Sequence, residues 1–119
     1  EIENSDSTIG PENTISQNNS GIVLKNARGE ISQNTITENK EDGILLENSS
    51  PKIQKNQILK NNDNGIRMKN NSSPSLIQNH FLQNKGFGIS FLQPGTVPWK
   101  SENFFQDNEK GPTDRMNTQ

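Results

Sequence analysis

The residues of this chain that could perform catalysis or bind a metal are few and scattered. Its 119 residues include one histidine, His80, and neither cysteine nor tyrosine. One histidine without thiolates cannot supply the ligand set of a transition-metal site. The acidic residues Glu41, Asp42 and Asp63 are expected to be solvated turn residues, and no phosphate-binding glycine loop, nucleophile elbow or pair of catalytic carboxylates is found. We therefore expect no metal and no cofactor, and we lean against an enzyme.

The composition excludes further classes of protein. The net charge is −2, hydrophobic residues make up 25% of the chain, and the mean hydropathy is −1.00. The balanced charge predicts no nucleic-acid partner. No apolar run approaches the roughly 18 residues of a membrane span. So polar a chain lies close to the composition of disordered segments, and only the order of its residues can indicate a fold.

That order is a repeat built on Gly-Ile pairs. The pairs begin at Gly21, Gly43, Gly65 and Gly88, at steps of 22, 22 and 23 residues, and Gly111 follows after another 23. Nearly all large apolar residues fall into columns that keep this period. The columns are Ile15, Ile36, Ile58, Phe81 and Phe105; Leu24, Leu46, Met68 and Phe91; and Ile9, Ile31, Ile53 and Leu76, with Trp99 in fifth place.

Asparagine follows the same period in three further columns. They are Asn13, Asn34, Asn56, Asn79 and Asn103; Asn18, Asn39, Asn61, Asn84 and Asn108; and Asn26, Asn48 and Asn70, which Asn4 precedes and Gln93 closes. Stacked amides can satisfy one another, since each carbonyl accepts from the amide of the next unit. We expect these columns to be inward-facing structural ladders, so that the Asn-x-Ser sequences at Asn18, Asn48 and Asn70 are not glycosylated.

Apolar residues alternate within each repeat, as at Ile44 and Leu46, and this period of two predicts strands. Three short strands and three bends fill about 22 residues, whereas helical repeats are roughly 33 residues long. We therefore predict an all-β parallel β-helix of about five coils over residues 1–111, with a frayed tail over 112–119. Glycine before the first strand of each coil is expected to supply a positive φ.

The segments Asn34 to Leu46 and Asn56 to Met68 read Asn-x-Ile-x-x-Asn-x-x-x-Gly-Ile-x-Leu or its close variant. They resemble the right-handed parallel β-helix repeat of NosD-type proteins and of carbohydrate-binding and sugar-hydrolase domains. The resemblance implies that the β-helix is right-handed. The spacing of the repeat does not determine its handedness. The proteins that share this repeat also include copper-site maturation proteins, polysaccharide lyases and epimerases. The single histidine argues against a copper site. The absence of tyrosine and of clustered acidic residues argues against a polysaccharide lyase or an epimerase.

Outward positions are the candidates for binding. Lys25, Glu47 and Lys69 should form a solvated ladder of charges, and Arg67 beside them is a candidate contact for a sugar or a carboxylate. On another side of the coils we expect an exposed apolar strip with a polar member. It is formed by Leu59, Leu82, His80 and Phe104 from successive repeats. This strip is either covered by a neighbouring domain or is a face for stacking sugars or binding a protein.

The two ends of the repeat differ. Trp99, Phe104, Phe105 and Met116 are expected to cover the last coil, and Gly111-Pro112 to stop the ladder. The repeat already runs at Ile2, which suggests a piece of a longer protein or edge-to-edge self-association through an uncapped first coil.

We therefore expect a non-catalytic β-helix module of an exported bacterial protein, located outside the cytoplasm, that binds carbohydrate or another ligand along its side or acts as a rigid spacer. Two alternatives remain open. One is a fragment of a polysaccharide lyase or epimerase, and the other is a protein-recognition module of a cytoplasmic adaptor. The partner is accordingly a polysaccharide or a protein.

Overall fold

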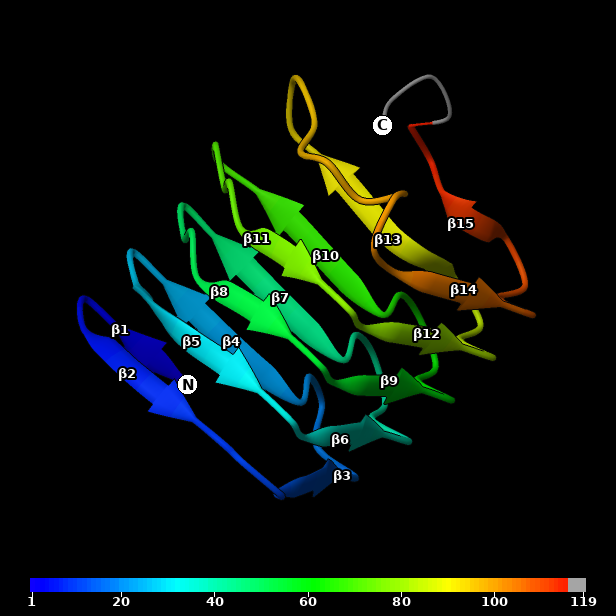
Figure 1. Cartoon of the computed structure of the whole chain (residues 1–119), viewed down its shortest axis with the longest axis horizontal. Helices are drawn as coiled ribbons and strands as arrows, with labels where there is room; N and C mark the ends of the chain where they lie inside the picture. Colours follow the sequence, from blue (N-terminus) through cyan, green and yellow to red (C-terminus); the bar gives the residue numbers. More distant parts are fainter. Residues whose placement is uncertain (116–119) are drawn as a thin grey trace.

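The chain winds into a solenoid of about five turns, in which each strand pairs in parallel with the equivalent strand one turn away. The structure is a computed structural model that describes residues 1–115, and the described residues contain no helix. Figure 1 shows the turns stacked side by side, from β1, β2 and β3 at one end to β14 and β15 at the other. The predicted parallel β-helix is therefore confirmed.

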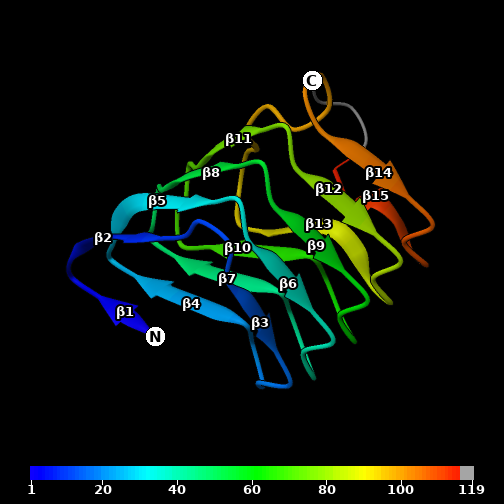
Figure 2. The same ribbon diagram turned by 60° about the horizontal axis from the view of Figure 1, so that its bottom comes forward.

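Three sheets form the sides of the solenoid, and Figure 2 shows them enclosing a common interior. The six-stranded sheet contains β1 (Ile2–Glu3), β4 (Ile22–Lys25), β7 (Ile44–Glu47), β10 (Ile66–Lys69), β13 (Phe87–Leu92) and β15 (Gly111–Thr113). The four-stranded sheet contains β2 (Asp6–Ile9), β5 (Arg28–Ser32), β8 (Lys52–Gln54) and β11 (Ser75–Ile77). The five-stranded sheet contains β3 (Thr14–Ser16), β6 (Thr35–Thr37), β9 (Gln57–Leu59), β12 (His80–Leu82) and β14 (Phe104–Gln106).

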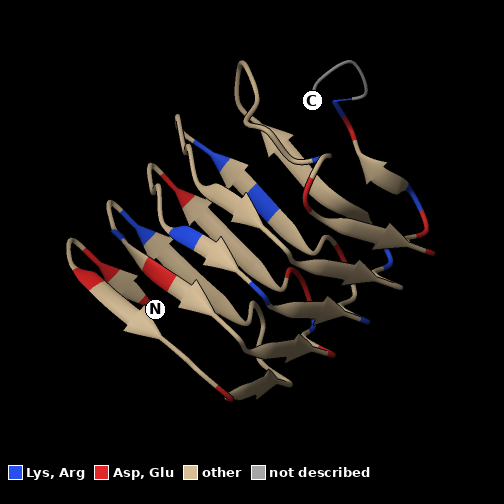
Figure 3. Cartoon of the chain, viewed as in Figure 1, with Lys and Arg blue, Asp and Glu red and all other residues tan. Residues whose placement is uncertain are grey.

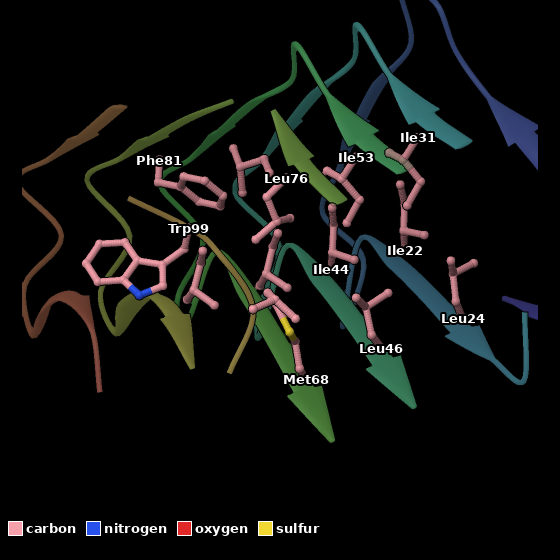
Figure 4. Packing of buried hydrophobic residues seen from close by; sticks show 14 of the residues in the cluster. Ile22, Leu24, Ile31, Ile44, Leu46, Ile53, Met68, Leu76, Phe81 and Trp99 are labelled. Carbon is pink, nitrogen blue, oxygen red and sulfur yellow. The ribbon is translucent and has the colours of Figure 1, made fainter. Parts of the chain in front are cut away.

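Strand register places like apolar residues over one another. Ile44 pairs with Ile22 on one side and with Ile66 on the other, and all three are buried. Figure 4 shows Ile44 and Leu46 of β7 projecting into the same interior as Ile53 of β8. Burying one such side chain contributes about 1.5–3 kcal/mol. Because the apolar residues fall into these columns, a small number of them forms one continuous core.

Two ladders of asparagine amides line two inner corners of the solenoid. The Asn56 Nδ2 donates to Asn79 Oδ1 at 3.0 Å and to the Ile31 carbonyl at 2.9 Å, so both of its protons are used. The backbone N–H of Asn56 donates to the same Asn79 oxygen at 3.0 Å. The pattern repeats at the second corner, where Asn61 Nδ2 donates to Asn84 Oδ1 at 2.9 Å. The hydrogen bonds of these buried amides compensate for the cost of removing them from water, because their polar atoms are paired.

The third asparagine column does not face inward, and the expectation for Asn26, Asn48 and Asn70 is wrong. These three side chains are exposed, and their backbones have φ between 47° and 62°. The inner ladder at this corner lies one residue later at Ala27 and Ser49, and two residues later at Ser72. The backbone N–H of Ala27 donates to Ser49 Oγ at 3.1 Å and that of Ser49 to Ser72 Oγ at 3.0 Å.

One local rule explains the corners. The residue immediately before each inward ladder residue tends to adopt a left-handed backbone, as Gln33 does before Asn34 with a φ of 59°. At the third corner asparagine itself takes the left-handed position, which it tolerates better than most residues. Asn48 therefore turns outward, and the serine that follows turns inward.

The Gly-Ile glycines are required by close packing and not by a positive φ, contrary to expectation. Gly21, Gly43, Gly65 and Gly88 are absent from the positive-φ residues. A Cβ on Gly43 would lie 2.8 Å from the Gly65 carbonyl oxygen and 2.9 Å from Asn61 Nδ2. Adjacent turns therefore approach one another too closely at this column for any side chain.

The C-terminal end is more ordered than predicted. β15 pairs with β13 so that Gly111 faces Phe87, one residue out of register with the glycine column. Asp114 then accepts hydrogen bonds from the Phe91 N–H at 3.0 Å and from Ser90 Oγ at 2.9 Å. Residues 112–115 thus continue the fold beyond the expected boundary at 111.

Aromatic rings close this end of the core, partly as expected. Trp99 is buried and meets Phe105 edge-on at 5.3 Å between ring centroids, and Phe105 stacks on Phe81 at 4.7 Å. Phe104 points outward and does not cover the coil. Met116 lies outside the described residues.

Candidate functional site

The outer surface of the five-stranded sheet carries no formally charged side chain. We call it the uncharged face, and its outward residues are Thr14, Ser16, Thr35, Thr37, Gln57, Leu59, His80, Leu82, Phe104 and Gln106. Charged residues make up 22% of the chain. The other two sheets present them outward, for example Lys69 on β10 and Lys52 on β8. Figure 3 shows β3, β6, β9, β12 and β14 without charged residues, while red and blue lie in the adjoining turns.

The chemistry of the uncharged face changes along the solenoid. Its N-terminal half presents hydroxyl groups, from Thr14 and Ser16 on β3 and from Thr35 and Thr37 on β6. Its C-terminal half presents the amides, apolar groups and rings of β9, β12 and β14. The face thus combines hydrogen-bonding groups with a hydrophobic platform.

Four of the five binding residues predicted from the sequence meet on this platform. His80 and Phe104 are partners in register, and their ring centroids lie 5.5 Å apart with the planes tilted by 45°. The Phe104 side chain is 48% exposed. Leu82 pairs with Leu59 beside them, and both are half-buried. The structure therefore contains the apolar strip with a polar member that the sequence predicted.

A hollow of about 580 Å³ adjoins the rings. It is lined by Gln78, Asn79, His80, Ser101, Glu102, Asn103 and Phe104. The fifth turn has no strand in the four-stranded sheet, and the end of the irregular segment from Gln93 to Asn103 lines the hollow instead. The Gln78 N–H donates to the Glu102 carbonyl at 2.6 Å and holds this loop against the fourth turn.

Sequence reasoning missed Gln78, Ser101 and Glu102 as members of this site. The feature of the sequence that could have indicated them is the irregular segment around Pro94 and Pro98, which interrupts the repeat. A second hollow of about 370 Å³ shares Ser101, Glu102 and Asn103 and continues between β11 and the buried Trp99.

Arg67, the fifth predicted binding residue, lies on the six-stranded sheet and is not brought together with the other four. Its Nη2 donates to Asp63 Oδ2 at 2.7 Å, and its Nε lies 3.1 Å from Asp42 Oδ2. The guanidinium is therefore held by two carboxylates of the same molecule.

Asp42 is buried, and its expected place as a solvated turn residue is wrong. Its Oδ1 accepts from both the backbone N–H and the side-chain amide of Asn64, each at 3.1 Å. Burial raises the pKa of the Asp42 carboxyl, and the Arg67 guanidinium opposes part of that rise. The Asp42 side chain thus belongs to an internal polar ladder.

The charge ladder expected beside Arg67 forms only in part. Lys69 Nζ lies 3.4 Å from Glu47 Oε2, whereas Lys25 Nζ lies 3.5 Å from Glu1 Oε2. Such exposed pairs contribute little stability, and they are not a candidate site.

Over residues 1–115, no group of three or more His, Cys, Asp or Glu side chains could hold a metal ion. A search of the same residues for a long apolar helix able to cross a membrane found none.

Comparison with known proteins adds one match. The family model described as periplasmic copper-binding protein (NosD) matches residues 1–118. No curated protein and no solved structure matches the chain. The match confirms the NosD-type resemblance that the repeat indicated.

Proposed function

The chain belongs to the family of periplasmic copper-binding proteins of the NosD type, and we propose that it binds carbohydrate through the C-terminal end of the uncharged face. The family is periplasmic, which confirms the expected location outside the cytoplasm. Membership also supports a non-catalytic exported module. The ligand is the further step that the proposal takes.

The observation that carries the proposal is the pair of rings beside a polar hollow. The exposed face of Phe104 and the adjacent His80 ring offer a platform for the apolar face of a sugar ring. Glu102, Ser101 and Gln78 line the adjoining hollow and can hydrogen-bond to sugar hydroxyls. Phe104 adjoins His80, and Leu82 adjoins Leu59, so the rings belong to a contiguous apolar strip. Such a strip with polar residues at its rim is typical of an interaction site.

Copper, which the family description names, is not supported by the donors of this chain. Copper sites in proteins are built from imidazole, thiolate and thioether groups. The sequence has one histidine and no cysteine. Of its two methionines, Met68 has its thioether buried in the core, and Met116 lies outside the described residues. The side chains of residues 1–115 do not fit a copper centre, so the proposal includes none.

The test is a glycan array followed by calorimetry with the sugars that bind, on the whole chain and on two variants. Phe104→Ala removes the platform, and Leu92→Ala is the matched control, because Leu92 is another large exposed hydrophobic residue (53% exposed) on a different sheet. We expect Phe104→Ala to weaken binding about tenfold or more, which corresponds to about 1.4 kcal/mol. Equal effects of the two variants, or no sugar bound at all, would refute the proposal.

A further inference from the structure

We propose that the ligand is an uncharged, extended polysaccharide that lies parallel to the solenoid axis along the uncharged face, with one sugar unit on each turn. This inference rests on the proposed function and adds the charge class, the length and the direction of the ligand.

The absence of charge on the ligand follows from the side chains of the uncharged face. A polymer of uronate units would bring one carboxylate per unit onto a surface whose outward residues include no lysine or arginine. Each carboxylate would lose hydration without gaining a counter-charge. The corner residues that follow β6, β9, β12 and β14 are of mixed charge: they are Glu38, Lys60, Gln83 and Asp107. The corners therefore provide no continuous row of positive charges that could pair with the carboxylates, and a neutral polymer fits best.

The direction follows from the dimensions of the face. The strands of the five-stranded sheet are three residues long and end at left-handed corners, so a ligand running along β12 meets only His80 and Leu82. Parallel to the axis, one column continues through every turn and contains Phe104, His80, Gln57, Thr35 and Thr14 in register. Only this second direction reaches every strand of the face.

The spacing of that column suits a sugar chain. Neighbouring strands lie about 4.8 Å apart, a distance comparable to the length of one hexose unit in an extended polysaccharide. Two consecutive units can thus stack on Phe104 and His80, and the following units reach the Gln57 amide and the Thr35 hydroxyl. The change from rings to hydroxyl groups along the face predicts stacking at one end and hydrogen bonding at the other.

The experiment measures affinity as a function of oligosaccharide length. Cello-, xylo- and manno-oligosaccharides, from disaccharide to hexasaccharide, are the neutral probes, and oligogalacturonides of the same lengths are the charged probes. We expect affinity for a neutral series to rise with each added unit up to the pentasaccharide, and the oligogalacturonides to bind more weakly at every length.

Two threonine variants give the direction. Thr35→Val removes a hydroxyl far from the rings, and Thr8→Val is its control, because Thr8 is an exposed strand residue of the four-stranded sheet. Thr35→Val should weaken binding of the hexasaccharide about two- to tenfold, the range of one hydrogen bond, and leave disaccharide binding unchanged. Thr8→Val should change neither. Phe104→Ala should weaken binding at every length.

The outcomes separate this inference from the proposed function. Affinity that stops rising at the disaccharide, or a Thr35→Val variant that behaves like Thr8→Val, overturns the direction while Phe104-dependent sugar binding stands. Oligogalacturonides that bind as tightly as the neutral probes overturn the charge class. A failure of all probes overturns both proposals, as would a dimer in sedimentation experiments that Phe104→Ala dissociates, because a second copy would then cover the face.

Discussion

Asn56 and Asn79 lie one turn apart, and a single oxygen, Asn79 Oδ1, accepts from both the side-chain amide and the backbone N–H of Asn56, each at 3.0 Å. The same arrangement joins Asn34 to Asn56, at 3.2 Å and 2.9 Å. Each amide therefore fixes the position of one turn relative to the next, while its own buried polar atoms remain hydrogen-bonded. This is how a chain with so few hydrophobic residues keeps a polar interior without unpaired groups along these corners.

Replacing Asn56 by leucine should destabilise the fold by about 1–3 kcal/mol. The substitution leaves the N–H groups of Asn34 without their acceptor and the Ile31 carbonyl without its donor. Urea denaturation measures the change. Asn62→Leu is the control, because Asn62 is exposed, and it should have little effect. An unchanged midpoint for Asn56→Leu would contradict the ladder.

Two neighbouring positions with opposite orientation test the assignment of faces. Ile58 is fully buried and Ile58→Ala should cost about 2–5 kcal/mol through lost packing and a cavity. His80 is exposed on the next turn, so His80→Ala should leave the free energy of unfolding nearly unchanged. Thermal and urea unfolding of both variants measure the difference. A large loss for His80→Ala would mean that the uncharged face is covered within the chain itself.

The buried carboxyl of Asp42 should make stability depend on pH in a predictable direction. Because burial raises its pKa in the folded state above the ordinary value of 3.8, the folded protein binds its proton more tightly than the unfolded chain does. This contribution is fully present below pH 3.8 and is lost as pH rises through the folded-state value.

The comparison with Asp42→Asn isolates that contribution. The difference in unfolding free energy between the native chain and Asp42→Asn should shift in favour of the native chain as pH falls from neutrality to below 3.8. Urea titrations at a series of pH values measure it. A constant difference would show that the ion pair with Arg67 cancels the effect of burial on the pKa, and a shift in the opposite direction would show that the ion pair outweighs it.

The repeat made most of the fold predictable, because strand register follows from period. Ile44 and Ile66 stand one repeat apart in the sequence and are direct partners in the sheet. The same argument placed His80 beside Phe104, since outward residues stack as regularly as inward ones. The platform was therefore visible in the sequence, whereas the hollow beside it was not, because it depends on where the loop that contains Ser101 and Glu102 packs.

Other errors arose where one residue type suits two environments. Asparagine fits both an inward ladder and a left-handed corner, so period alone could not separate Asn48, which is exposed, from Asn56, which is buried. Glycine likewise serves a positive φ and a close approach of two backbones, and Gly43 proved to be the second case. Asp42 resembled a surface turn residue because its partner Arg67 lies on the following turn.

Asp114 provides the last test, at the end of the solenoid that the sequence predicted to be frayed. Its carboxylate accepts from the Phe91 N–H and the Ser90 hydroxyl of β13. Asp114→Ala should therefore destabilise the chain by about 1.5–3 kcal/mol, the range for hydrogen bonds to a charged group, and should speed amide exchange at Phe91. Glu109→Ala, an exposed acidic neighbour, should change neither quantity. Identical exchange at Phe91 in the two variants would mean that the last turn ends at Gly111, as the glycine period alone suggests.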